Sequence, residues 1–400
     1  MILKIKSKIK SYIRYAIYRV KFYFQERSNV IILDDIFPHL LSGFRIAEFN
    51  VYLENIDKCK VFSTSSAFQA VHESRSFEEV KNEYSKLYPS NNKKIIEYTG
   101  QDIKANLVYA VFLNNIYNFL QQITLYKTPF IFTLYPGGGF RLNQKESDRM
   151  LKEVFASPYF RKVIVTTKTT FDYLLNNNFC DKGKIEFIYG VVSQSNVFKI
   201  HDFEKKKMLA DKSKLDICFV AHKYTHQGKD KGYDIFIKVA KILSKIHKNI
   251  FFHVVGTFDE SDIDVSDIKN NIIFYKTLKT HEFSKFYQNV DIILSPNSSF
   301  ILAPGAFDGF PTGACIEAGL NGVALFVSDD LKQNFVFKED EEIVIISLDP
   351  NEIVDKVLYY YNNPERLYSL SEKGKLQIQS IYNLESQMNP RIDIINKAIS

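Results

Sequence analysis

The segment 291–330 holds the residues of this chain whose types and spacing best suit the binding of a phosphorylated ligand. An apolar run there is followed by a glycine-containing loop and then by a helix that is expected to begin after Pro311. Proline suits a first helical position because it has no N–H to lose and its φ is already helical. The amides of Thr312, Gly313 and Ala314 are then expected to be free at the positive helix end, which attracts a diphosphate.

Two acids flank this helix start. Glu317 lies on the first turns of the helix and can accept hydrogen bonds from two vicinal hydroxyls with its two oxygens. Asp308 lies at the end of the loop and can accept hydrogen bonds from a sugar attached to the diphosphate. The segment therefore predicts a site for a diphosphate whose attached groups carry hydroxyls.

The sequence Asp308-Gly309-Phe310-Pro311, followed by Glu317-Ala318 and Asn321-Gly322, resembles the signature of the GT-B glycosyltransferases, especially the retaining family 4. The resemblance implies that Asp308 contacts the donor sugar and that Glu317 contacts the ribose. Two features depart from the family pattern: the first acid is Asp rather than Glu, and it lies one residue further from Glu317 than is usual.

The same resemblance implies a cationic grip on the diphosphate. The family places an Arg just after the first strand of the C-terminal half and a Lys-Gly pair at the start of the next helix. Here Lys231-Gly232 precedes the helix expected at 233–247, and His222 stands at the Arg position, with Lys223 and Lys229 as alternative cations. A solvated basic loop without a ligand is the competing interpretation.

The resemblance also suggests where the nucleobase lies. A strand expected at 271–275 is followed by Lys276, Thr277 and Leu278, and the family recognises the base at this turn through backbone groups. A structural turn without a ligand is an equally good interpretation.

Two glycine turns in the N-terminal half are expected to line a cleft. The turn at 42–45 contains Gly43 and resembles the glycine loop after the first strand of GT-B enzymes. The turn at 134–141 contains Gly138, which permits close approach of the backbone to a ligand, and Arg141, which can stabilise developing negative charge. Tight turns without a ligand remain the alternative for both.

Apolar runs alternate with helical patterns along both halves of the chain, which is typical of parallel sheets. Strands are expected at 29–33, 60–63, 107–112, 130–135, 163–166, 217–220, 250–255, 271–275, 291–295, 323–328 and 342–346. Helices are expected at 45–55, 114–122, 147–155, 233–247, 281–288 and 313–321. The fold class predicted is α/β, with two Rossmann-like doubly wound parallel-sheet domains facing a cleft, as in GT-B.

This order of elements suggests a division of the chain into five parts. We expect a basic amphipathic helix at 1–27, an acceptor-side domain at 28–200, a linker at 201–215, a nucleotide-sugar-binding domain at 216–362, and helices at 363–400 that cross back to the first domain.

The N-terminal segment 1–27 carries eight Lys and Arg residues against a single acid, Glu26, with apolar residues at helical spacing. Such a helix suits the surface of an anionic membrane. The alternative is a solvated helix packed on its own domain. No uncharged apolar stretch is long enough to span a bilayer, and the four scattered cysteines favour a reducing compartment, so a cytoplasmic and peripheral location is expected.

Metal chemistry has little support in the sequence. Asp262-Ile263-Asp264 spells the metal-holding pattern of another transferase fold, but it lies in an acidic run that is expected to be a solvated loop. The eight histidines have no metal-ligand spacing. We therefore expect neither a metal nor a cofactor, and the net charge of +6 does not call for nucleic acid.

Taken with the resemblance, these features predict a retaining, metal-independent glycosyltransferase. It would move a sugar from a nucleotide donor, with UDP or GDP as the expected carrier, to a glycan or lipid-linked acceptor in cell-surface polysaccharide synthesis. Two alternatives stay open at this point: a sugar-nucleotide epimerase of the same fold, and a carbohydrate-binding GT-B protein without catalysis.

Overall fold

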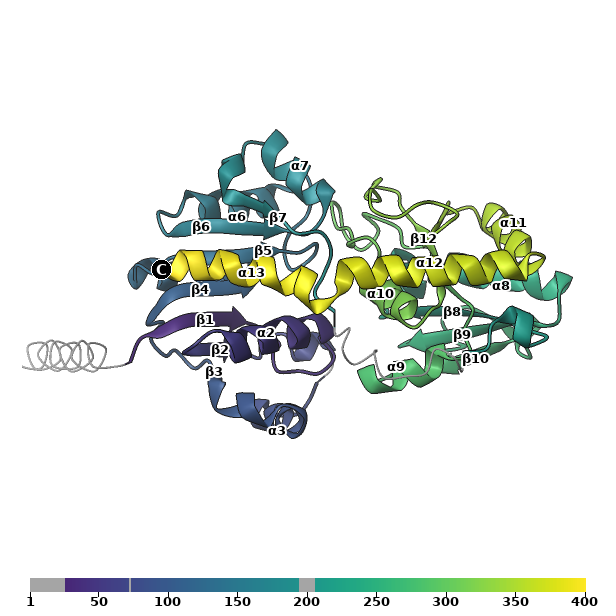
Figure 1. Cartoon of the computed structure of the whole chain (residues 1–400), viewed down its shortest axis with the longest axis horizontal. Coiled ribbons are helices and arrows are strands. Elements are labelled where there is room, and N and C mark those ends of the chain that lie inside the picture. The colour runs from purple at the N-terminus through teal and green to yellow at the C-terminus, as the bar shows by residue number, and fades with distance from the viewer. Residues whose placement is uncertain (1–25, 72, 194–205) are drawn as a thin grey trace, which may run out of the picture.

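The computed structural model describes residues 26–71, 73–193 and 206–400. Two separate parallel sheets, each covered by helices on both faces, lie side by side along the long axis of the molecule (Figure 1). The predicted α/β class with two Rossmann-like domains is confirmed. The predicted basic helix at 1–27 lies almost entirely outside the described residues.

The first sheet has the strand order β3-β2-β1-β4-β5-β6-β7, and every pairing in it is parallel. Its strands are β1 (Ser28–Asp34), β2 (Cys59–Ser63), β3 (Ile95–Glu97), β4 (Ala105–Val111), β5 (Phe130–Leu134), β6 (Phe160–Val165) and β7 (Ile185–Phe187). Its helices are α2 (Gly43–Asn55), α3 (Phe77–Leu87), α4 (Leu113–Asn118), α5 (Leu120–Leu125), α6 (Lys145–Ala156) and α7 (Lys168–Asn176).

The second sheet has the order β10-β9-β8-β11-β12-β13, again with parallel pairings throughout. Its strands are β8 (Leu215–Ala221), β9 (Ile250–Gly256), β10 (Ile272–Tyr275), β11 (Ile292–Ser295), β12 (Ala324–Ser328) and β13 (Val344–Ile346). Its helices are α8 (Tyr233–Ile246), α9 (Thr280–Tyr287), α10 (Gly313–Leu320), α11 (Pro350–Tyr361) and α12 (Pro364–Tyr382).

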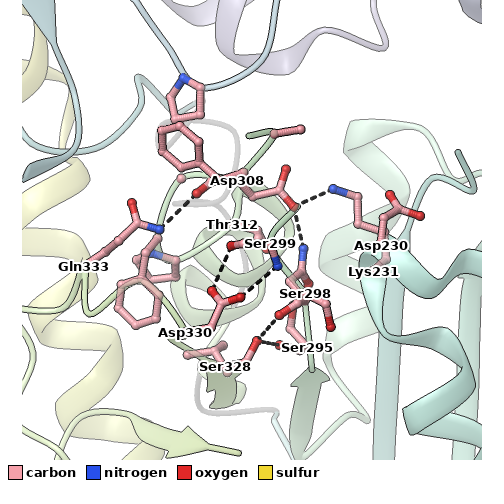
Figure 2. A pocket seen from close by; sticks show the side chains of 18 of the residues that line it. Asp230, Lys231, Ser295, Ser298, Ser299, Asp308, Thr312, Ser328, Asp330 and Gln333 are labelled. Carbon is pink, nitrogen blue, oxygen red and sulfur yellow. Dashed lines mark hydrogen bonds and ion pairs between the residues drawn. The ribbon is translucent and has the colours of Figure 1, made fainter. Parts of the chain in front are cut away.

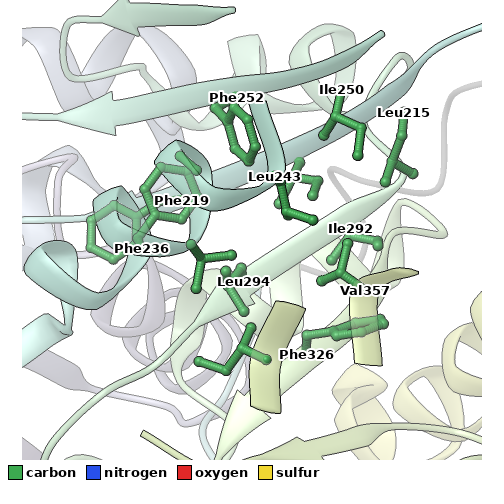
Figure 3. Close-up of a cluster of buried hydrophobic side chains, with 14 of the residues drawn as sticks. Leu215, Phe219, Phe236, Leu243, Ile250, Phe252, Ile292, Leu294, Phe326 and Val357 are labelled. Carbon is green, nitrogen blue, oxygen red and sulfur yellow. The ribbon is translucent and has the colours of Figure 1, made fainter. Parts of the chain in front are cut away.

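The core of the second sheet explains why its strands are nearly continuous apolar runs. Parallel strands are buried on both faces, so residues of either parity must be apolar. Figure 3 shows Phe219, Phe252, Leu294 and Phe326 of four strands beside Leu243 of α8, and all are at most 2% exposed. Burying one such side chain contributes about 1.5–3 kcal/mol.

The last two helices connect the domains. α12 packs on the second sheet, and α13 (Leu384–Ile399) places Met388 and Ile395 in the core of the first sheet. The chain turns between them at Asn383, whose side chain caps α13 by accepting the N–H of Ser386 at 2.8 Å. The C-terminal segment thus lies along both domains (Figure 1).

Candidate active site

A cavity lies at the point in the second sheet where the order of the strands along the chain reverses. The chain builds β8, β9 and β10 outwards and then returns to β11 beside β8, so the loops after β8 and β11 separate there. Ligands of open parallel sheets bind in the crevice at such a switch point. The cavity has a volume of about 710 Å³, including its solvent-open part.

The cavity brings together many of the residues predicted from the sequence. The walls include Lys231, Asp308, Gly309, Phe310, Pro311 and Thr312. Pro136 and Gly137 of the first domain also line it, so the two domains share the cavity.

Lys231 and Asp308 form the central ion pair of this cavity. Nζ of Lys231 lies 2.6 Å from Oδ2 of Asp308, and the same oxygen accepts a hydrogen bond from Nδ2 of Asn297 at 2.7 Å. The Lys231 side chain is 14% exposed and that of Asp308 42% exposed, so the carboxylate is the more accessible partner. Figure 2 shows Lys231 directed at Asp308 across the cavity.

The loop that carries Asp308 makes hydrogen bonds, through side chains and backbone, with residues that the sequence did not single out. Nε2 of Gln333 donates to the Asp308 carbonyl at 3.0 Å, and the Ser298 N–H donates to the Asp230 carbonyl at 3.1 Å. The Ser299 N–H donates to Oδ2 of Asp330 at 2.8 Å. Gln333 and Asp230 are each at most 5% exposed, so their contacts with the loop are shielded from water.

Gly232 shows why Lys231 occupies its place. Its φ is +71°, and a Cβ there would lie 2.0 Å from the carbonyl oxygen of Pro296. Only glycine allows the start of α8 to approach the end of β11 this closely. The Lys-Gly pair therefore has a steric reason as well as a chemical one.

The helix α10 begins at Gly313, as the expected range 313–321 has it, but Pro311 and the free amides are placed differently from the prediction. Thr312, with φ −65° and ψ 160°, is the N-cap of α10, so Pro311 precedes the cap and is not the first helical residue. The first intrahelical hydrogen bond runs from the Ile316 N–H to the Thr312 carbonyl at 3.0 Å. The N–H groups that precede this bond belong to Gly313, Ala314 and Cys315, rather than to 312–314.

Glu317 faces the first domain. It is half-buried, and this burial raises its pKa to about 7. A Cβ added at Gly43, the first residue of α2, would lie 3.8 Å from Oε1 of Glu317. The structure therefore brings Gly43 and Glu317 together across the interdomain gap, as expected if both line the cleft.

The remaining cations after β8 have different surroundings. His222 is half-buried and does not line the cavity; its ring centroid lies 4.9 Å from that of Tyr224, over whose ring the Lys231 ammonium is placed at 5.6 Å. Nζ of Lys223 lies 2.7 Å from Oδ1 of Asp262, away from the cavity, and Lys229 is exposed.

The acidic run around Asp262 is more ordered than the solvated loop expected from the sequence. The Asp262 side chain is only 13% exposed, because it pairs with Lys223 and accepts the Asp259 N–H at 3.1 Å. Asp264 is exposed. Within the part of the chain that the structure describes, no three His, Cys, Asp or Glu side chains are grouped in a way that could hold a metal ion.

The other predicted contact residues lie outside the cavity walls. Lys276, Thr277 and Leu278 follow β10, the edge strand, and are exposed or half-buried. A Cβ at Gly138 would lie 2.4 Å from the Phe112 side chain, so this glycine serves packing, whereas Gly137 borders open space.

Arg141 is exposed, and its N–H donates to Oγ of Ser147 at 2.9 Å. The next residue, Leu142, joins the two domains directly, because its N–H donates to the Gly305 carbonyl at 2.9 Å. Arg141 is therefore near the loop that carries Asp308 without lining the cavity itself.

No helix among the described residues is long and apolar enough to cross a membrane.

Comparison with known proteins agrees with this geometry. Residues 201–377 match the family model of the glycosyl transferases group 1. An uncharacterized glycosyltransferase of Haemophilus influenzae is 27% identical over 188 residues, which cover 45% of this chain and 48% of the relative. The chain thus spans about half the length of the curated relative that it matches.

Two solved structures share the whole fold. HepE of Anabaena in complex with UDP superposes with a TM-score of 0.69 and 11% identity, over 92% of this chain and 100% of that one. WaaG, a glycosyltransferase involved in lipopolysaccharide biosynthesis, gives a TM-score of 0.55 and 11% identity, over 92% and 99%. At such low identity these likenesses show the fold alone, and the predicted GT-B arrangement is confirmed.

Proposed function

Because residues 201–377 match the family model of the glycosyl transferases group 1, we propose that this chain transfers a sugar from a nucleotide donor to an acceptor hydroxyl. The observation that carries the proposal is the meeting of Lys231, Asp308 and the α10 N-terminus in one cavity that both domains line. UDP or GDP is the proposed carrier.

The donor diphosphate binds between Lys231 and the first amides of α10. A phosphate offers Lys231 a stronger, charge-assisted partner than a carboxylate that is already shared with Asn297. When Lys231 turns to the phosphate, the exposed Asp308 carboxylate becomes available to a sugar hydroxyl. Glu317 accepts hydrogen bonds from the ribose.

The reaction we propose is transfer with retention and without a metal. The acceptor oxygen forms a bond to the anomeric carbon while the bond from that carbon to the phosphate oxygen breaks, and the electron pair leaves with the nucleoside diphosphate. The acceptor proton passes to the departing phosphate oxygen. Lys231 and the α10 amides stabilise the negative charge that develops there.

We propose a glycan or lipid-linked acceptor of cell-surface polysaccharide synthesis, reached from the cytoplasmic face. The cavity mouth supports an acceptor with an apolar part: Leu302 lines the cavity, and Phe300, Ile301 and Leu302 are 45–50% exposed. The cationic segment 1–27 supports attraction to an anionic membrane. WaaG, which shares the fold, is described as acting in lipopolysaccharide biosynthesis.

A donor screen tests this proposal. Thermal shift with UDP, GDP, ADP and their sugars identifies the carrier, and chromatography of the products then follows turnover. Release of free nucleoside diphosphate together with a glycosylated or hydrolysed sugar supports transfer. An isomerised nucleotide sugar without free nucleotide contradicts transfer and supports the epimerase, and binding without any turnover supports a non-catalytic protein.

A further inference from the structure

A tyrosine of the first domain touches the donor-binding turn of the second. Tyr189 follows β7, the last strand of the first sheet, and its hydroxyl donates to the Phe310 carbonyl at 2.7 Å. Phe310 is 5% exposed and stands two residues before Thr312, the N-cap of α10. This hydrogen bond therefore joins the exit of one domain to the backbone that presents the α10 amides.

The backbone between this bond and the helix has little freedom. Pro311 follows Phe310 and its ring fixes φ. A displacement of the Phe310 peptide is consequently passed to Thr312 and Gly313 rather than absorbed. A shift of the amides by a few tenths of an ångström weakens hydrogen bonds to a phosphate, because these depend steeply on distance and angle.

Tyr189 itself is held from several sides. Its ring lies edge-on to that of Phe335, with centroids 5.0 Å apart, and its carbonyl accepts Nε2 of Gln387 in α13 at 2.9 Å. The neighbouring Gly190 has φ +87°, and a Cβ there would lie 2.4 Å from the Tyr382 ring of α12. The two helices that connect the domains thus fix the Tyr189 backbone.

We infer that Tyr189 is a positioning residue that couples the arrangement of the two domains to the geometry of the diphosphate seat. Tyr189 does not line the cavity, so its effect on a ligand passes through the Phe310 carbonyl. The α10 amides are correctly placed only when the domains adopt the arrangement in which this hydrogen bond forms. The inference rests on the proposed function, because it assumes that these amides bind a diphosphate.

Isothermal titration of the full chain with UDP and GDP tests the inference on Tyr189→Phe. Loss of this hydrogen bond is expected to weaken the binding of whichever nucleotide, UDP or GDP, binds wild type more tightly by about threefold to tenfold. The matched control is Tyr361→Phe at the end of α11, which removes a 2.9 Å hydrogen bond to Asn249, the residue before β9, and is expected to bind as wild type does.

A second variant tests whether the packing of the Tyr189 ring affects nucleotide binding through the same hydrogen bond. Phe335→Leu, at an exposed residue, releases the ring of Tyr189 and is expected to weaken binding by a similar factor. Because both changes act on one hydrogen bond, the double variant should lose no more than the worse single one. Wild-type affinity in Tyr189→Phe, or losses that multiply in the double variant, would overturn the inference. Absence of nucleotide binding by the wild-type chain would instead overturn the proposed function, and the inference with it.

Discussion

Replacing Glu317 by Gln should make nucleotide-sugar binding independent of pH. Burial holds the Glu317 pKa at about 7 in the empty site, well above the usual range of a carboxyl group. A raised pKa means that the carboxyl is protonated below pH 7, and only the ionised form offers acceptors on both oxygens to the ribose. Wild-type affinity should therefore fall as pH drops through 7.

The size of the effect follows from this pKa. A group with a pKa of 7 is about one-tenth ionised at pH 6 and about nine-tenths ionised at pH 8, so wild-type affinity should change about tenfold between them. At pH 8, Glu317→Gln should bind about tenfold or more weakly than wild type, since hydrogen bonds to a charged group contribute about 1.5–3 kcal/mol. At pH 6 the two proteins should bind nearly alike.

The stability of the empty wild-type protein should change with pH in the opposite direction to its affinity for the nucleotide sugar. A carboxyl with a raised folded-state pKa favours the folded state while it is protonated, and this contribution is lost as pH rises from the unfolded value of 4.5 through 7. Removing the ionisable group should therefore stabilise the empty protein at pH 8, by about 1–3 kcal/mol once partial exposure is allowed for. Urea unfolding measures this gain.

The assay is calorimetric titration with a nucleotide sugar, because its diphosphate does not change charge between pH 6 and 8. The control variant is Glu352→Gln, at an exposed residue of α11. Parallel pH curves for wild type and Glu317→Gln would refute the assigned role of the carboxylate.

Three further changes probe the site and the core. Lys231→Ala should reduce transfer at least a hundredfold while Lys229→Ala, an exposed lysine of the same loop, leaves it unchanged; equal effects in a steady-state assay would contradict a phosphate contact. Asp308→Asn should free Lys231, so that the bare nucleoside diphosphate binds as well as in wild type or better while transfer falls more than tenfold; weaker nucleotide binding by calorimetry would contradict this. Leu243→Ala, in the core of the second domain, should lower the free energy of unfolding by about 2–5 kcal/mol in a urea titration and leave nucleotide affinity unchanged, and a large change in affinity would show that core and site are coupled.

The centre of the site was predictable because its determinants are local. A run of buried strand residues followed by glycines, an acid and a helix start indicates a loop at a carboxyl sheet edge, and Lys231 and Asp308 do meet there. Thr312 could have been recognised as the N-cap, because threonine is a favoured cap and proline is not. The helix start at Gly313 was predicted correctly, and only the role of Pro311 and the set of free amides were wrong.

Other features of the site and the fold could not be predicted from the sequence. Asn297 and Gln333 are ordinary polar loop residues, and only the folded loop brings their amides to Asp308. Three consecutive glycines give no indication that the middle one, Gly138, packs against a phenylalanine while Gly137 borders the cavity. The three-residue strands β3 and β7 were not expected from the sequence, and the helix expected at 114–122 divides into α4 and α5 at Phe119.

A crystal structure of the full chain with the nucleoside diphosphate that shifts its melting temperature most tests the central claim directly. We predict phosphate oxygens within hydrogen-bonding distance of the Gly313 and Ala314 amides and of Nζ of Lys231, with the Lys231–Asp308 ion pair broken. A diphosphate bound elsewhere, with that ion pair intact at 2.6 Å, would contradict the account.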